Sequence, residues 1–84
     1  MRFDARLVVR TKSGVRDPQA DAIGGVLSHV GAGAITVARS GKMLDLSVEA
    51  PNKGAATAAI EEACRAVLVN PALEEYAIEF LGAP

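Results

Sequence analysis

Apolar and polar residues alternate in several stretches of the chain, a pattern typical of a strand with one buried face. The clearest stretch is residues 2–11, in which one face carries Phe3, Ala5, Leu7 and Val9 while the other is mostly charged. Strands of this kind form a sheet that is covered on one side and wet on the other. The predicted strands are residues 2–11, 34–39, 42–50 and 75–81.

Two segments between the strands repeat apolar residues at helical spacing. Asp17-Pro18 begins the first, because an aspartate can accept hydrogen bonds from first-turn amides and proline fits the first helical position. The apolar face of this helix, expected to be buried, consists of Ile23, Val26, Leu27 and Val30.

The second predicted helix covers residues 55–69 and stops at Asn70-Pro71, because a residue before proline disfavours helical geometry. A closing strand follows at once, with Tyr76, Ile78 and Phe80 on one side. The expected buried stripe of this helix is Ile60, Ala63, Cys64, Val67 and Leu68.

The order of elements is therefore βαββαβ, with Ser40-Gly41 as a tight hairpin turn between the middle two strands. This order predicts an α+β, ferredoxin-like sandwich: a four-stranded antiparallel sheet with both helices on one face, in a single domain of residues 1–84. The open sheet face is expected to be a solvated face or a polar assembly surface. It would carry Arg2, Asp4, Arg6 and Arg10 beside Asp45, Glu49 and Glu79.

Composition narrows the classes of function. The chain has 84 residues, so its hydrophobic core is small. Its net charge is −1, so it has no basic surface that would attract nucleic acid. A single cysteine fits a reducing compartment, and the charged N-terminus and lack of a long apolar run predict neither a leader nor a membrane span. A soluble cytoplasmic protein is expected, with oligomerisation as a common remedy for so small a core.

Few residues are candidates for chemistry. His29 has no second histidine, cysteine pair or acidic cluster beside it, so a solvated residue at a helix end is expected. Cys64 lies on an apolar stripe without a neighbouring histidine, which favours a core residue over a nucleophile. Arg39 and Lys42 place two cations at the expected hairpin tip, where a solvated turn and a partner or anion contact both remain open.

Three motifs together resemble the PurS family, the small subunit of phosphoribosylformylglycinamidine (FGAM) synthase. The first is Gly14-Val15 followed by Asp17-Pro18-Gln19, and the second is Arg39-Ser40-Gly41-Lys42 with alternating Leu44 and Leu46. The third runs from Cys64 through Asn70-Pro71 to Glu75-Tyr76 and Ile78-Glu79. The sequence departs from the family pattern at Ala20, Gly24-Gly25, Val67 and Val69.

The resemblance implies a non-catalytic accessory subunit in purine biosynthesis. Such a subunit bridges a glutaminase subunit and a large ATP-dependent synthetase subunit, assists ammonia transfer, and forms a homodimer or tetramer. This chain would bind no cofactor or metal itself, while the complex would use ATP and Mg. The partner-interface residues implied by the motifs are Asp17, Pro18, Gln19, Arg39, Gly41, Lys42, Asn70, Pro71 and Tyr76.

Two other classes fit the same fold. An acylphosphatase-like hydrolase would need a phosphate-cradling loop after the first strand and an asparagine in the second, and residues 34–39 contain none. A stand-alone small-molecule-sensing regulatory domain is the main alternative, although such domains are usually fused to an enzyme or transporter.

Overall fold

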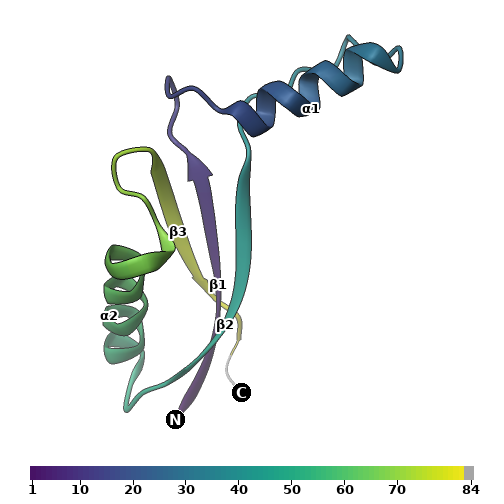
Figure 1. Cartoon of the computed structure of the whole chain (residues 1–84). Helices are drawn as coiled ribbons and strands as arrows, with labels where there is room; N and C mark the ends of the chain where they lie inside the picture. The colour runs from purple at the N-terminus through teal and green to yellow at the C-terminus, as the bar shows by residue number, and fades with distance from the viewer. Residues whose placement is uncertain (83–84) are drawn as a thin grey trace.

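The computed structural model describes residues 1–82 and shows a three-stranded sheet, one helix packed on it, and one helix that projects away (Figure 1). The sheet is antiparallel with strand order β2-β1-β3. The elements in chain order are β1 (Arg2–Thr11), α1 (Pro18–His29), β2 (Gly41–Glu49), α2 (Lys53–Ala63), a π-helical turn (Cys64–Leu68) and β3 (Glu74–Phe80).

The core lies between the central strand β1 and α2. Ala5, Leu7 and Val9 are fully buried, as the alternation predicts, and Leu7 lies between Leu44 of β2 and Ile78 of β3 in the register. Burying an aliphatic side chain of this size contributes about 1.5–3 kcal/mol. The buried side chains of β1 therefore hold the sheet against α2.

The second helix is interrupted by a π-helical turn that the sequence pattern did not reveal. The Val69 amide donates to the Cys64 carbonyl at 3.1 Å, a five-residue step that inserts one residue into the helical repeat. The inserted residue turns the following side chains to a different side of the helix, so Val69 is buried and Val67 is 79% exposed. The prediction that Val67 lies on the buried stripe is therefore wrong, whereas Ile60 and Cys64 are in the core.

The expected four-stranded sheet is also wrong, because residues 34–39 form no strand. They follow a turn in which the Ala32 amide donates to the Leu27 carbonyl at 2.8 Å. Ser40-Gly41 is no hairpin turn, since the Ser40 carbonyl already accepts from the Thr11 amide of β1 at 3.1 Å. The chain thus enters the sheet directly beside β1.

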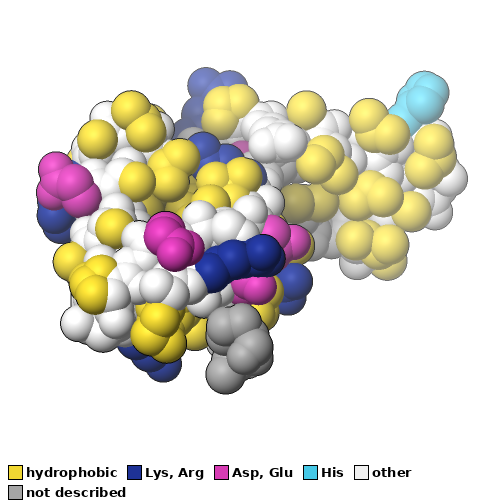
Figure 2. All heavy atoms as spheres, turned by 90° about the horizontal axis from the view of Figure 1, so that it is seen from below, with side chains coloured by type: hydrophobic (Ala, Val, Ile, Leu, Met, Phe, Trp, Pro, Cys, Tyr) yellow, Lys and Arg dark blue, Asp and Glu magenta, His cyan; other side chains and the backbone are white. Residues whose placement is uncertain are grey.

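The first helix does not cover the sheet as expected. Together with the returning segment it forms an arm, residues 18–39, that extends beyond the end of the sheet (Figure 1). The radius of gyration is 16.3 Å, against about 12 Å for a compact chain of this length. Apolar side chains lie along the outside of this arm, with the cyan histidine near its far end (Figure 2). The apolar face of α1 is therefore available to another molecule.

Candidate partner-binding surface

Asp17 holds the two ends of the arm together. One carboxylate oxygen accepts from the Ala20 amide at 2.9 Å and from the Ser40 hydroxyl at 2.7 Å, and the other accepts from the Ser40 amide at 2.6 Å. The residue is only 8% exposed. Asp17 is thus the N-cap expected from the sequence and, in addition, a clasp between the start of α1 and the end of the returning segment.

These hydrogen bonds also stabilise the charged form of the clasp. The Ser40 amide, followed by the Ala20 amide and the Ser40 hydroxyl, lowers the pKa of Asp17 far below its ordinary value. A carboxylate that accepts several hydrogen bonds while shielded from water favours ionisation in this way. The clasp therefore remains charged at every physiological pH.

The chain passes very close to β1 where the arm returns to the sheet. A side chain at Gly41 would overlap the carbonyl oxygen of Val9, so only glycine fits at the first position of β2. This constraint explains the glycine in Arg39-Ser40-Gly41-Lys42 as a requirement of packing. It also fixes Lys42 at the base of the arm.

The structure brings most of the predicted interface residues to one hollow at the arm base. Pro18 and Gln19 come from the start of α1, and Gly41 and Lys42 come from the start of β2. The hollow, with a volume of about 390 Å³, is lined by Thr11, Asp17, Pro18, Gln19, Ser40, Gly41, Lys42 and Glu74. Two motifs that are more than twenty positions apart in sequence therefore share one surface.

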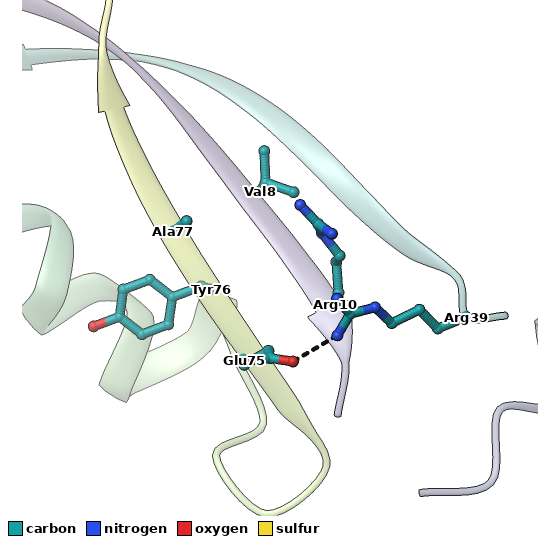
Figure 3. A pocket seen from close by; sticks show the side chains of 6 residues that line it. All are labelled: Val8, Arg10, Arg39, Glu75, Tyr76 and Ala77. Atoms are coloured by element: carbon teal, nitrogen blue, oxygen red, sulfur yellow. Dashed lines mark hydrogen bonds and ion pairs between the residues drawn. The ribbon is translucent and has the colours of Figure 1, made fainter. Parts of the chain in front are cut away.

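Arg39 belongs to a neighbouring hollow on the open face of the sheet (Figure 3). Its guanidinium donates to the Glu75 carboxylate of β3 at 2.6 Å, and Arg10 of β1 lies beside this pair. Arg39 is therefore held within the chain, and is not a free cation at a hairpin tip. Sequence reasoning places Arg10 on this open face but misses Glu75, because the strand register is needed to show that the two residues are neighbours.

Asn70, Pro71 and Tyr76 do not line the hollow at the arm base, although Tyr76 lines the neighbouring hollow together with Arg39. The Asn70 side chain accepts from the Ala72 amide at 3.1 Å, and the Pro71 carbonyl accepts from Lys12 at 2.7 Å, so this turn is tied to the end of β1. Tyr76 points toward the α2 side of the sheet, away from Arg10 (Figure 3). The structure gives the Asn-Pro turn a role in folding, and its place in an interface remains a prediction.

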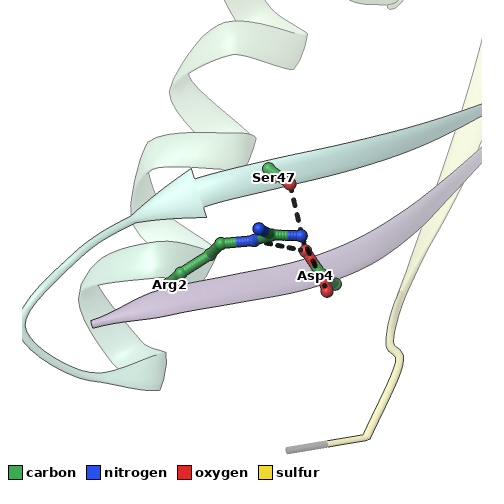
Figure 4. A network of polar contacts seen from close by, with 3 residues as sticks. All are labelled: Arg2, Asp4 and Ser47. Carbon is green, nitrogen blue, oxygen red and sulfur yellow. Dashed lines mark hydrogen bonds and ion pairs between the residues drawn. The ribbon is translucent and has the colours of Figure 1, made fainter. Parts of the chain in front are cut away.

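The open sheet face carries charges that are paired within the chain. Asp4 accepts from Arg2 at 3.1 Å and from Ser47 at 3.0 Å, and the Arg2 hydrogen bond, with Ser47 second, lowers the pKa of Asp4 (Figure 4). Arg6 donates to Asp45 on the neighbouring strand at 3.1 Å. Exposed pairs of this kind contribute little to stability, and they leave the face with mixed charge.

No catalytic constellation is present among residues 1–82. Cys64 is buried and burial raises the pKa of its thiol, which disfavours the reactive thiolate. Within the described part of the chain, no three His, Cys, Asp or Glu side chains are grouped to hold a metal ion. Neither helix there has the length and apolarity to cross a bilayer.

The family model and the relatives that match this chain all belong to one protein family. A family model described as PurS, phosphoribosylformylglycinamidine (FGAM) synthase, matches residues 4–82. The phosphoribosylformylglycinamidine synthase subunit PurS of Thermotoga maritima is 38% identical over 79 residues, which cover 94% of this chain and 96% of that protein. The corresponding subunit of Methanocaldococcus jannaschii is 27% identical over 77 residues, covering 92% and 93% of the two chains.

Solved structures share the fold. A chain in the structure of PurLQS from Thermotoga maritima matches with a TM-score of 0.84 and 37% identity, covering 96% of this chain and 99% of that chain. PurS of B. subtilis matches with a TM-score of 0.84 and 25% identity, covering 95% and 99%. The similarity therefore extends over nearly the full length of both partners in each comparison.

Proposed function

Because the chain belongs to the PurS family of FGAM synthase, we propose that it joins the glutaminase subunit of that enzyme to the large synthetase subunit and assists ammonia transfer between them. A relative with 37% identity has been solved in a PurLQS structure, which supports membership of a multi-subunit complex in purine biosynthesis. We place this complex in the cytoplasm.

One observation carries this proposal: two family-like motifs meet at the base of the arm without any catalytic chemistry. Asp17 and Gly41 fix the backbone there, and Pro18, Gln19 and Lys42 line the hollow between α1 and β2. A rigid polar surface of this kind suits orientation of partner subunits. Arg39 and Glu75 extend it onto the open sheet face.

In the proposed complex, ATP and magnesium are used by the large synthetase subunit. The role of this chain is one of position, since ammonia released into water is protonated and diluted, whereas ammonia passed between aligned sites remains available. A subunit that keeps two active centres aligned raises the rate of glutamine-dependent FGAM formation without contributing a reacting group. We also propose a homodimer or tetramer, supported by the small core and the uncovered apolar face of the arm.

Reconstitution with the glutaminase and synthetase from the same cell tests this function. FGAM formation from glutamine should depend strongly on this chain, whereas formation from added ammonium should need it much less. Equal rates with and without the chain for both nitrogen sources would refute the proposal.

A charge exchange tests the surface itself. The triple variant Arg39→Glu, Glu75→Arg, Lys42→Glu keeps the ion pair between β3 and the arm base and changes the charge presented to a partner. Its affinity for the partner subunits should fall at least about tenfold, because like charges across an interface are strongly unfavourable. The matched control is the exchange Glu62→Arg, Arg65→Glu, an exposed pair on α2. Equal affinity of the two variants, measured by calorimetry, would exclude this surface.

A further inference from the structure

One arginine on the open face of the sheet differs from the others on that face. The other arginines there are held in ion pairs within the chain, with N–O distances between 2.6 and 3.1 Å. These pairs are Arg2–Asp4, Arg6–Asp45 and Arg39–Glu75. Arg10 is also exposed, but no carboxylate of residues 1–82 lies within ion-pair distance of its guanidinium. Its charge is therefore available to a group from outside the chain.

Arg10 lacks a partner because of its neighbours on the two flanking strands. In the register it lies opposite Glu75 of β3 and Gly41 of β2. The Glu75 carboxylate accepts from Arg39, whose side chain reaches across β1 (Figure 3). Gly41 has no side chain, and a larger residue there would overlap the Val9 carbonyl. The fold thus occupies the one nearby carboxylate and leaves the β2 side of Arg10 open.

The hollow beside Arg10 carries one excess positive charge. It has a volume of about 170 Å³, and its charged residues are Arg10, Arg39 and Glu75. Two guanidinium groups and one carboxylate leave a single positive charge, which one further carboxylate would neutralise. A phosphate group carries about −1.5 to −2 at neutral pH and would exceed it. Guanidinium groups also match carboxylates through pairs of parallel hydrogen bonds. The charge of the hollow therefore favours a carboxylate.

An apolar row beside the hollow indicates what carries this carboxylate. Val8 lies opposite Met43 of β2 and Ala77 of β3, so apolar residues cross the open face next to Arg10. Met43 is 55% exposed, and a second hollow of about 290 Å³ connects it with Arg10 and Arg39. The first hollow is smaller than the roughly 300–1,000 Å³ typical of small-molecule sites. It fits one charged group, with the remainder of the occupant lying along the apolar row, as in a protein interface.

We propose that Arg10 and Arg39 bind an acidic side chain of a partner subunit, with its carboxylate in the hollow and its aliphatic part on Val8 and Met43. This inference rests on the proposed function and deepens it, because it names the group on the partner that the open face recognises. Glu75 is a positioning residue in this site, since its hydrogen bond of 2.6 Å holds Arg39 beside Arg10. A guanidinium that is already ordered loses less conformational freedom on binding.

Removal of the charge at position 10 tests the site. Arg10→Gln should weaken binding of the full chain to the glutaminase and synthetase at least about tenfold in calorimetry, because the partner's carboxylate would lose its charged partner. The fold should be retained, since Arg10 is exposed and forms no ion pair among residues 1–82. The matched control is Arg2→Gln, which removes the same charge from the same face, where Arg2 is paired with Asp4. Its effect should be no more than about twofold.

The outcomes separate this site from the proposed function. Equal losses of affinity in the two variants would show an effect of net charge alone and would overturn the site, as would unchanged affinity of Arg10→Gln. Either result leaves the proposed function intact, because the unmodified chain still binds. Absence of binding by the unmodified chain would refute the proposed function, and the site with it.

A cross-linking experiment identifies the group in the hollow. Arg10→Lys places an amine there, and a carbodiimide joins amines to carboxylates that are in direct contact. The complex should yield a peptide that links position 10 to an aspartate or glutamate of the glutaminase or the synthetase. Arg2→Lys, the control, should link only within the chain. A link from position 10 only to Glu75 or to a second copy of this chain, or no link at all, would overturn the proposal.

Discussion

Replacing Asp17 with asparagine is expected to loosen the base of the arm while leaving the sheet intact. Asparagine keeps one carbonyl oxygen, which can still cap the Ala20 amide. Its amino group, however, would face the Ser40 amide, so two donors would meet where a carboxylate oxygen now accepts at 2.6 Å. The substitution therefore separates the clasp from the helix cap.

The expected cost follows from the hydrogen bonds that are lost. A bond to a charged group contributes about 1.5–3 kcal/mol, and the Ser40 amide would be left without an acceptor in a nearly buried site. A loss of about 2–3 kcal/mol corresponds to a roughly 30- to 150-fold larger equilibrium constant for local opening, and hence to faster amide exchange. Because α1 makes little contact with the sheet, this change should stay local.

Amide hydrogen exchange of the whole protein measures this opening directly. Exchange at Ser40 should accelerate by the predicted factor, while exchange at Leu7 in the buried strand should not change. Asp21→Asn is the matched control, since Asp21 also lies in the first turn of α1 but is exposed. Unchanged protection at Ser40 in Asp17→Asn would refute the role of the clasp.

The lowered pKa of Asp17 also predicts that protection of the Ser40 amide depends on pH. The pKa of Asp17 is lowered in the folded protein, so the clasp contributes its full stability above the unfolded value of about 3.9. As the pH falls from about 4 toward the folded pKa, this contribution should be lost progressively, and protection at Ser40 should fall with it. Asp17→Asn should lack this acid-dependent step.

Two further substitutions test the packing. Gly41→Ala should lower the free energy of unfolding by about 1–3 kcal/mol in urea titrations, because the added methyl group overlaps the Val9 carbonyl. The control is Gly25→Ala in α1, where the added methyl group meets open space. This control should raise helix stability by up to about 1 kcal/mol. Equal effects of the two substitutions would contradict the close approach at β2. Ile60→Ala should cost about 2–5 kcal/mol because Ile60 is 2% exposed in the core, and a cost below 1 kcal/mol would show that α2 is not packed as described.

The candidate surface was only partly predictable. Asp17 and Pro18 were recognised as a helix start from local capping chemistry, and the structure places them there. The bond from Asp17 to Ser40 joins residues 23 positions apart, and nothing in the local pattern indicated it. The sequence predicts Arg39 at a hairpin tip, in a solvated turn or at a partner or anion contact, whereas its pairing with Glu75 depends on where the returning chain meets the sheet.

By itself the sequence determined the local features of this protein. Alternation identified the buried face of β1, and the Asn70-Pro71 stop separated the second helix from the last strand. The motifs at both ends of the arm, together with the closing motif, indicated the PurS family. The first two signals depend on residues within about one turn of helix or a few strand positions of each other, whereas the family resemblance depends on three motifs spaced along most of the chain.

The tertiary structure decided what covers those faces. The apolar period of α1 predicted a buried stripe, but not whether the covering surface belongs to the same chain, because periodicity records the side of a helix and not its partner. Residues 34–39 had the alternation of a strand, yet Ser40 pairs with β1 and leaves them outside the sheet. The arm that results is the main difference between the predicted four-stranded sandwich and the observed fold.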